Sequence, residues 1–386
     1  MPDVLTGVNL WGSRYAPLRM SGDLARIVEA SGHVDQVLVW DQLMSWFPQH
    51  LWTPQNSPVA SVAPDIDSIA DPFATICFAL SATEGKIGFG VGTDMLRRNP
   101  SELAQMLLTL ASTTTGPGCF YLGAGEAKNT VAFGIKRALG VKRLEDGLAI
   151  LEKMLKGTEK FDHEGTVWNL KDAFLGNGGK DRNPKVIAMG GGERLINAAL
   201  AHADGLAVGV PFVTPYADEF GEFVSAQRNG LKKLGRDPDD FDFGAIHMLF
   251  VCESEDAFEQ WVDNPLLKFF AATAGRLDMS KWEREGIESV MPLDWHYAFK
   301  MLPGSYTRDE VYTITDKVTP DMVRKTYHIG NPAEIAAKIR PFTEAGATRH
   351  AFADVSALLG IKDATAAVEG MIEVSRLVKS DEPLPA

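Results

Sequence analysis

The chain has few cysteines, no basic leader and no long apolar run. Its 386 residues include only Cys77, Cys119 and Cys252, all set in apolar runs. An odd and small number of this kind excludes a disulfide framework and a cysteine metal cluster, so we expect buried thiols of a reducing compartment and no metal site. Because neither a basic region nor an apolar stretch follows the first methionine, we expect no secretion and no membrane span, with the cytoplasm as the location.

Positive charge is also scarce. The formal net charge is −13 and the pI is about 5.1, which argues against a general affinity for nucleic acid or anionic membranes. With 45% hydrophobic and 23% charged residues, the chain is typical of a globular protein with a large core. A small-molecule partner is therefore expected.

Strand-like apolar runs alternate with helical patterns along the chain. Eight such runs are predicted as strands, at residues 4–9, 36–40, 86–91, 119–122, 185–189, 206–210, 245–251 and 349–353. Amphipathic segments with apolar residues at three-to-four spacing lie between them. Eight alternating units predict an α/β fold, a (β/α)8 TIM barrel in a single domain over residues 1–386, with its site at the C-terminal ends of the strands.

Three segments do not fit this alternation. Residues 45–67 and 275–330 are rich in aromatic side chains, and residues 158–184 contain a predicted hairpin, FDHEGTVWNL. The first and third follow strands two and seven, so we expect them over the mouth of the barrel as lids or substrate walls. The alternative interpretation is subunit contact, and a homodimer is the expected assembly.

Two strands near the middle of the chain run into loops of small residues. Gly90 and Gly92 belong to the first loop, and Gly123 and Gly125 belong to the second, which also delivers Glu126. Missing Cβ atoms would let a flat ligand touch the main chain. The alternative is that these glycines only form tight turns between strands and helices.

The chain resembles a known family in several motifs that occur in the family's order. These are GVGTDMLRRNP, YLGAGEAKN, RLEDGLAILEKML, FDHEGTVWNL and VIAMGGGERLINAALAHADGLAVG. They are similar to the luciferase-like TIM-barrel superfamily, and within it to the branch that uses the deazaflavin coenzyme F420. That branch contains glucose-6-phosphate dehydrogenases, secondary alcohol dehydrogenases and the phthiodiolone ketoreductase.

The resemblance implies a set of cofactor-binding residues. Asp41 would lie beside the deazaflavin ring, and Gly90, Val91, Gly92 and Thr93 would form the floor, with a cis peptide bond between Gly90 and Val91. Ring-edge and tether contacts are implied for Gly125, Glu126 and Asn129. The cofactor phosphate is expected at a helix start formed by Met189, Gly190, Gly191, Gly192 and Glu193, where Arg194 would have to offset the carboxylate.

The resemblance also implies catalytic positions near strand two. Trp46 matches a tryptophan near the reacting carbon, and Glu126 matches an active-site carboxylate. Gln42 stands where the F420 dehydrogenases have histidine; its amide can bind a carbonyl or hydroxyl oxygen but cannot exchange a proton near neutral pH. Glu126 is therefore our first candidate for the proton, with His247, His296 and Asp94 as further candidates.

Together these features predict an F420-dependent oxidoreductase that moves a hydride between the deazaflavin and the carbonyl or carbinol carbon of an apolar ketone or alcohol. Ketone reduction is the expected direction, because Gln42 cannot be the base that alcohol oxidation needs. Two alternatives stay open. One is an FMN-dependent luciferase-like monooxygenase, and the other is a protein that binds deazaflavin without turnover.

Overall fold

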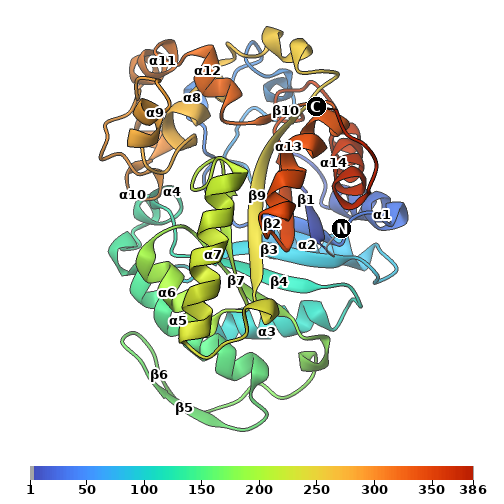
Figure 1. Ribbon diagram of the computed structural model, residues 1–386, viewed down its shortest axis with the longest axis vertical. Coiled ribbons are helices and arrows are strands. Elements are labelled where there is room, and N and C mark those ends of the chain that lie inside the picture. Colours follow the sequence, from blue (N-terminus) through green and yellow to red (C-terminus); the bar gives the residue numbers. More distant parts are fainter. Residues whose placement is uncertain (1–3, 386) are drawn as a thin grey trace.

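The computed structural model describes residues 4–385. Eight parallel strands close into a barrel in the order β1–β2–β3–β4–β7–β8–β9–β11, and β11 pairs with β1 (Figure 1). The strands are β1 (Leu5–Asn9), β2 (Gln36–Trp40), β3 (Gly88–Asp94), β4 (Gly118–Gly123), β7 (Lys185–Met189), β8 (Gly205–Val210), β9 (Asp242–Val251) and β11 (Arg349–Asp354). Each coincides with a predicted strand, so the predicted TIM barrel is confirmed.

One principal helix follows each strand and covers the outside of the barrel. These helices are α1 (Arg19–Ser31), α2 (Pro72–Ser81), α3 (Pro100–Ala111), α5 (Gly140–Lys156), α6 (Glu193–His202), α7 (Ala217–Lys233), α13 (Pro332–Glu344) and α14 (Ala364–Lys379). Capping side chains determine where several of these helices begin. At α3 the Asn99 side chain accepts from the Ser101 N–H ahead of Pro100, and at α13 Asn331 and Glu334 form a capping box.

Alternate residues of each strand face opposite sides of the barrel wall. In β2, Val37 and Val39 belong to the core between strands and helices, whereas Leu38 belongs to the smaller core inside the barrel. The period of two in a strand therefore decides which side chains can reach a site inside the barrel mouth.

The three irregular segments lie in two different places. Residues 158–184 carry the hairpin β5 (Phe161–Glu164) and β6 (Asn169–Ala173) at one end of the molecule. At the opposite end lies a cluster of short helices (orange, Figure 1). Its elements are α8 (Pro265–Ala274), α9 (Ser280–Arg284), α10 (Tyr297–Lys300), α11 (Arg308–Asp316) and α12 (Pro320–Arg324), followed by β10 (His328–Gly330), which pairs with β9.

A second hydrophobic core joins this cluster to residues 45–67. Leu51 and Trp52 from the first segment share it with Trp282 and Trp295 from the other. We call residues 45–67 and 265–330 together the cap. Their shared core indicates that the two parts of the cap stabilise each other, although 197 positions separate them in the chain.

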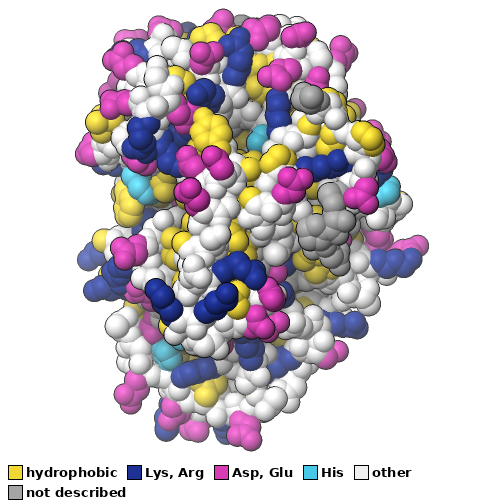
Figure 2. Space-filling view, viewed as in Figure 1, with side chains coloured by type: hydrophobic (Ala, Val, Ile, Leu, Met, Phe, Trp, Pro, Cys, Tyr) yellow, Lys and Arg dark blue, Asp and Glu magenta, His cyan; other side chains and the backbone are white. Residues whose placement is uncertain are grey.

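The surface agrees with the low content of positive charge. Acidic and basic side chains are interspersed over the face in Figure 2, and no extended basic patch gathers on that face. Within residues 4–385 no helix has the length and apolar character needed to cross a membrane.

Candidate active site

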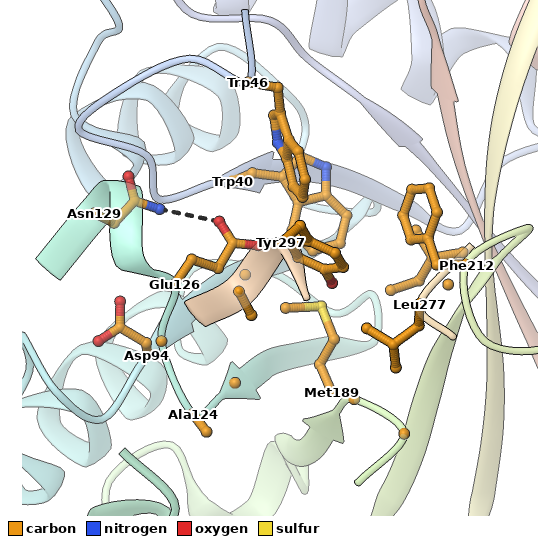
Figure 3. Close-up of a pocket in the computed structure, with 18 of the residues that line it drawn as sticks. Trp40, Trp46, Asp94, Ala124, Glu126, Asn129, Met189, Phe212, Leu277 and Tyr297 are labelled. Carbon is orange, nitrogen blue, oxygen red and sulfur yellow. Dashed lines mark hydrogen bonds between the residues drawn. The ribbon is translucent and has the colours of Figure 1, made fainter. Parts of the chain in front are cut away.

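A cavity of about 510 Å³ lies at the C-terminal ends of the barrel strands, beneath the cap (Figure 3). Its volume is in the usual range for small-molecule sites. Most of the predicted site residues line it together: Asp41, Gln42, Trp46, Gly92, Thr93, Gly125, Glu126, Asn129, Met189, Gly190, Gly191, Gly192 and Glu193. Gly90, Val91 and His247 do not line it.

The two glycines of β3 have different surroundings from those predicted. A Cβ on Gly90 would lie 2.5 Å from Leu38 Cδ2, and a Cβ on Gly92 would lie 2.0 Å from the Trp40 ring. Side chains of β2 therefore fill both spaces. Gly92 reaches the cavity beside Trp40, but the prediction that Gly90 and Val91 form a cofactor floor is corrected, because Gly90 packs inside the barrel and Val91 in the outer core.

The predicted cis peptide bond is also wrong. Among the described residues the cis peptide bond lies between Val210 and Pro211, and the bond between Gly90 and Val91 is trans. The extended β3 continues through both residues to Asp94 and pairs regularly with β2 and β4.

Glu126 contributes a carboxylate to the wall of the cavity. It follows β4 and precedes the short helix α4 (Ala127–Thr130), after Gly125, whose φ of +84° a side chain would strain. Asn129 Nδ2 donates to Glu126 Oε2 over 3.3 Å, and Figure 3 shows the carboxyl near the ring of Tyr297. The side chain of Glu126 is 26% exposed, so it is accessible to a ligand.

Lys128 is a residue of this site that the sequence analysis missed. Its side chain is 1% exposed, and its Nζ lies 3.3 Å from Glu126 Oε2 and donates to the Met44 carbonyl over 2.9 Å. It also lies 5.0 Å from the centre of the Trp46 ring. Burial lowers the pKa of Lys128, while Glu126 acts in the opposite direction. Lys128 thus holds Glu126, the loop after β2 and Trp46 in fixed relation.

Asn129 also connects the loop after β2 with the loop that carries Glu126. Its Oδ1 accepts from the backbone N–H groups of Leu43, over 2.9 Å, and Met44, over 3.3 Å. An asparagine at this position therefore fixes the strand-two loop beside Glu126. These hydrogen bonds explain a buried asparagine at position 129 without the predicted contact to the side chain of the cofactor.

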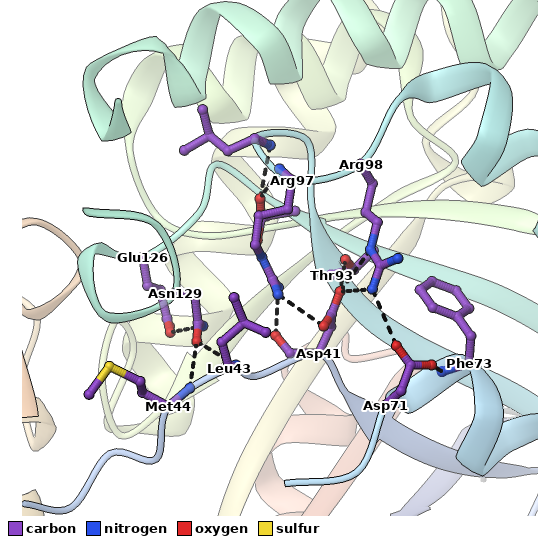
Figure 4. Close-up of polar contacts among 12 residues, drawn as sticks. Asp41, Leu43, Met44, Asp71, Phe73, Thr93, Arg97, Arg98, Glu126 and Asn129 are labelled. Carbon is purple, nitrogen blue, oxygen red and sulfur yellow. Dashed lines mark hydrogen bonds and ion pairs between the residues drawn. The ribbon is translucent and has the colours of Figure 1, made fainter. Parts of the chain in front are cut away.

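Asp41 lies in a buried network of charges at the edge of the cavity (Figure 4). Its carboxylate accepts from Thr93 Oγ1 over 2.7 Å and Arg97 Nη1 over 3.0 Å, and it pairs with Arg98 over 3.2 Å. Arg97 also donates to Asp94 over 2.7 Å. Arg97 and Arg98 follow β3, which pairs with β2, and Asp41 follows β2. These consecutive arginines were the signal for this network in the sequence.

The cap supplies an aromatic wall. Trp46 packs against Phe270 and Tyr297, with ring centroids 5.4 and 5.0 Å apart, and Phe212 lies 6.4 Å away. Trp46 comes from the first part of the cap and Tyr297 from the second. The aromatic chamber next to the carboxylate of Glu126 therefore depends on both parts of the cap.

The N-terminus of α6 opens onto the cavity. Gly192 is its N-cap residue and no side chain caps it, so its first-turn N–H groups can bind an anion. The expected compensation of Glu193 by Arg194 is absent, because Arg194 pairs with Glu145 over 2.5 and 3.0 Å. Since Glu193 is exposed to solvent, water can screen its charge.

The position of His247 corrects the prediction that it acts on the substrate. Its neighbours in β9, Ile246 and Met248, line the cavity, so His247 faces the outer helices and is fully buried. It lies in a chain of hydrogen bonds, 3.1 Å from His328 and 2.9 Å from His350. Burial lowers the pKa of His328 to about 4 and that of His350 to about 3, and the pKa of His247 is also lowered well below its usual value.

This histidine chain predicts a loss of stability in mild acid. In the unfolded chain each imidazole binds a proton near pH 6.5, whereas the folded protein keeps His328 and His350 neutral to much lower pH, so stability falls as the pH drops below about 6.5. At pH 5 we expect each to lower the free energy of unfolding by on the order of 2 kcal/mol. Urea unfolding at pH 7.5 and pH 5.0 measures the difference.

The control for this prediction is His328→Gln, which removes one titrating group and keeps a hydrogen-bonding side chain beside His247. Its loss of stability between the two pH values should be smaller than that of the parent protein. Burial raises the pKa of Asp354 to about 6, which opposes the histidine effect, so the difference between variant and parent is the decisive quantity. Equal losses in both proteins would contradict the prediction.

Comparison with known proteins places the chain in a family. Residues 4–349 match the model of the luciferase-like monooxygenase family, so the chain belongs to that family and is an enzyme of the oxidoreductase type. It is 24% identical over 341 residues to the phthiodiolone/phenolphthiodiolone dimycocerosates ketoreductase of Mycobacterium kansasii, covering 86% of this chain and 90% of that protein.

Two further relatives bear the coenzyme in their names. An F420-dependent glucose-6-phosphate dehydrogenase of Kineococcus radiotolerans is 23% identical over 294 residues, covering 71% of this chain and 73% of that protein. The structure of an F420-dependent secondary alcohol dehydrogenase with an F420-acetone adduct matches with a TM-score of 0.72 and 19% identity, over 98% of this chain and all of that one. The structural likeness shows the shared fold.

Proposed function

We propose that this protein is an F420-dependent oxidoreductase that reduces the carbonyl group of an apolar ketone, with the reverse alcohol oxidation as the slower direction. The observation that carries the proposal is that an aromatic wall, several glycines and the carboxylate of Glu126 line the same cavity. The F420-dependent relatives support the choice of cofactor.

The cavity fits a deazaflavin on structural grounds. Gly123 ends β4 and Gly190 follows β7, the neighbouring strand, and both line the cavity without a side chain. A Cβ on Gly192 would enter open space, and the uncapped start of α6 beside it can hold a phosphate. When bound, reduced F420 supplies the hydride, and the protein supplies orientation and a dry site.

The side chains around the cavity can orient the substrate, transfer the proton and exclude water. Gln42 lines the cavity and can donate an amide N–H to the carbonyl oxygen of a ketone. Glu126, which solvent can reach, is the group that would take up a proton from water and pass it to that oxygen as the hydride reaches the carbon. Lys128 holds Glu126 in place, and Trp46 excludes water from one side of the site.

Titration of the purified protein with F420 and with FMN, followed by fluorescence quenching, tests the cofactor. We expect submicromolar affinity for F420 and at least about tenfold weaker binding of FMN, because the relatives found by sequence that carry a coenzyme in their names are named for F420. Tight FMN binding without F420 binding would overturn the proposal in favour of a monooxygenase. Absorbance of F420 with a panel of apolar ketones and alcohols then compares the two directions. If F420 binds and no substrate changes its absorbance, the protein binds the coenzyme without this reaction.

A further inference from the structure

Arg137 is a buried guanidinium in the cavity wall that lacks an acidic partner. It is 9% exposed and lines the cavity. No hydrogen bond or ion pair joins its guanidinium group to another described residue, and its buried Nε has no partner. The guanidinium lies over the ring of Phe299, 4.4 Å from its centre. Burial lowers the pKa of Arg137, which reflects the cost of holding a charge there, while Glu126 and Asp94 act in the opposite direction from beyond ion-pairing distance.

Three other cations at or beside the cavity are paired with carboxylates. Arg97 pairs with Asp41 and Asp94, and Lys128 pairs with Glu126. Arg194, which also lines the cavity, pairs with Glu145. Since a buried charge without a partner destabilises a protein, Arg137 differs from its neighbours in a way that folding alone does not explain.

His296 is a second polar group without a partner on the same wall. It precedes α10 and lines the cavity, and its Nδ1 is buried without a hydrogen bond. Its ring centre lies 4.7 Å from that of Phe299, the residue that Arg137 contacts. Burial and the charge of Arg137 both lower the pKa of His296, so a neutral imidazole with one N–H to donate stands beside the guanidinium.

The surroundings of these two groups define the kind of ligand they suit. Phe299, Phe212, Leu277 and the aromatic ring of Tyr297 line the same cavity, and they favour an apolar body. A guanidinium is planar and binds carboxylates and phosphates through paired hydrogen bonds. The cavity therefore combines an apolar chamber with one position for an anionic oxygen group.

We propose that Arg137 and His296 form an anion-binding subsite that holds a carboxylate carried by the apolar substrate. The inference rests on the proposed function for the identity of the substrate as a ketone. It refines the expected substrate from a wholly apolar molecule to an apolar keto acid. The cofactor is the other possible source of an anionic oxygen group, and the experiment separates the two sources.

The test compares the keto acid 5-oxo-5-phenylpentanoate with its methyl ester, by calorimetric titration of the protein with and without F420. We expect the parent protein to bind the acid at least about tenfold more tightly than the ester, from the strength of a charge-assisted hydrogen bond. Arg137→Gln should abolish this preference and leave ester affinity unchanged, and Arg137→Lys should retain part of it. The melting temperature of ligand-free Arg137→Gln should equal or exceed that of the parent, because the substitution removes an unpaired buried charge.

Each result has a defined meaning. Loss of the acid preference in Arg137→Gln supports the substrate carboxylate, and a loss of F420 affinity instead assigns the anionic group to the cofactor. If neither quantity changes, or if the only effect is a lower melting temperature, Arg137 is a packing residue and the proposal is wrong. If the parent protein fails to bind F420 while its acid preference still depends on Arg137, the subsite stands and the proposed function falls.

Discussion

Replacing Glu126 with glutamine should lower kcat for ketone reduction by about 100-fold or more, with little change in the affinity for F420. The substitution keeps the shape of the side chain and a polar amide beside Asn129, but it removes the proton that the accessible carboxyl can exchange. General acid–base catalysis typically contributes a factor of this size. Steady-state kinetics and F420 titration measure the two quantities separately.

The effect of Glu126→Gln on Lys128 needs a matched control. Glu126→Gln leaves the buried Lys128 without its carboxylate partner, which could disturb the loop independently of proton transfer. The double variant Glu126→Gln with Lys128→Met removes both charges, and we expect it to remain slow. Glu222→Gln on the exposed face of α7 serves as a surface control with parental kinetics. Parental activity in the double variant would remove Glu126 from the mechanism.

Replacing Arg97 with methionine should destabilise the protein by about 3–5 kcal/mol, the typical cost of removing one partner from a buried ion pair. The side chain of Arg97 is 8% exposed, and those of Asp41 and Asp94 are 2% and 6% exposed. Without Arg97, Asp94 loses its ion-pair partner and Asp41 keeps only Arg98 and Thr93. Urea unfolding at pH 7.5 measures the free energy of unfolding.

Arg98→Met provides the comparison. Arg98 is 22% exposed and shares Asp41 with Arg97, so its loss should cost about 1 kcal/mol or less, as for partly exposed ion pairs. Adding Asp94→Asn to Arg97→Met should recover part of the lost stability, since it removes one uncompensated charge. Similar costs for the two arginine variants, or no recovery, would show that the network is not the source of the stability.

Several features of the site could be predicted because they depend on chain order. Asp41 and Glu126 each follow the end of a parallel strand and Gly92 lies two residues before such an end, and these ends meet at one mouth of a closed barrel. Trp46 could be assigned to the mouth for the same reason, because it follows β2 directly. For these residues, identification of the strand was enough to identify the side of the barrel on which they lie.

Other features depended on contacts between residues far apart in the chain. The sequence suggested that a ligand contacts Gly90, but in the structure Leu38 from the neighbouring strand fills the space beside it. Lys128 carried no signal of its own, because an isolated lysine is usually exposed; only the carbonyl of Met44 and the carboxylate of Glu126 explain its burial.

By itself the sequence determined the number and order of the strands, the barrel that they close and the mouth that carries the site, because hydrophobic periodicity and strand order are local properties of the chain. The tertiary structure alone decided which charges are paired and which face the cavity. His247 differs from Met248 by one position in β9, and that one step directs it to the opposite face of the wall. The Arg137 side chain lacks an ion-pair partner because no acidic group within residues 4–385 lies within ion-pairing distance, and such distances are set when the whole chain packs.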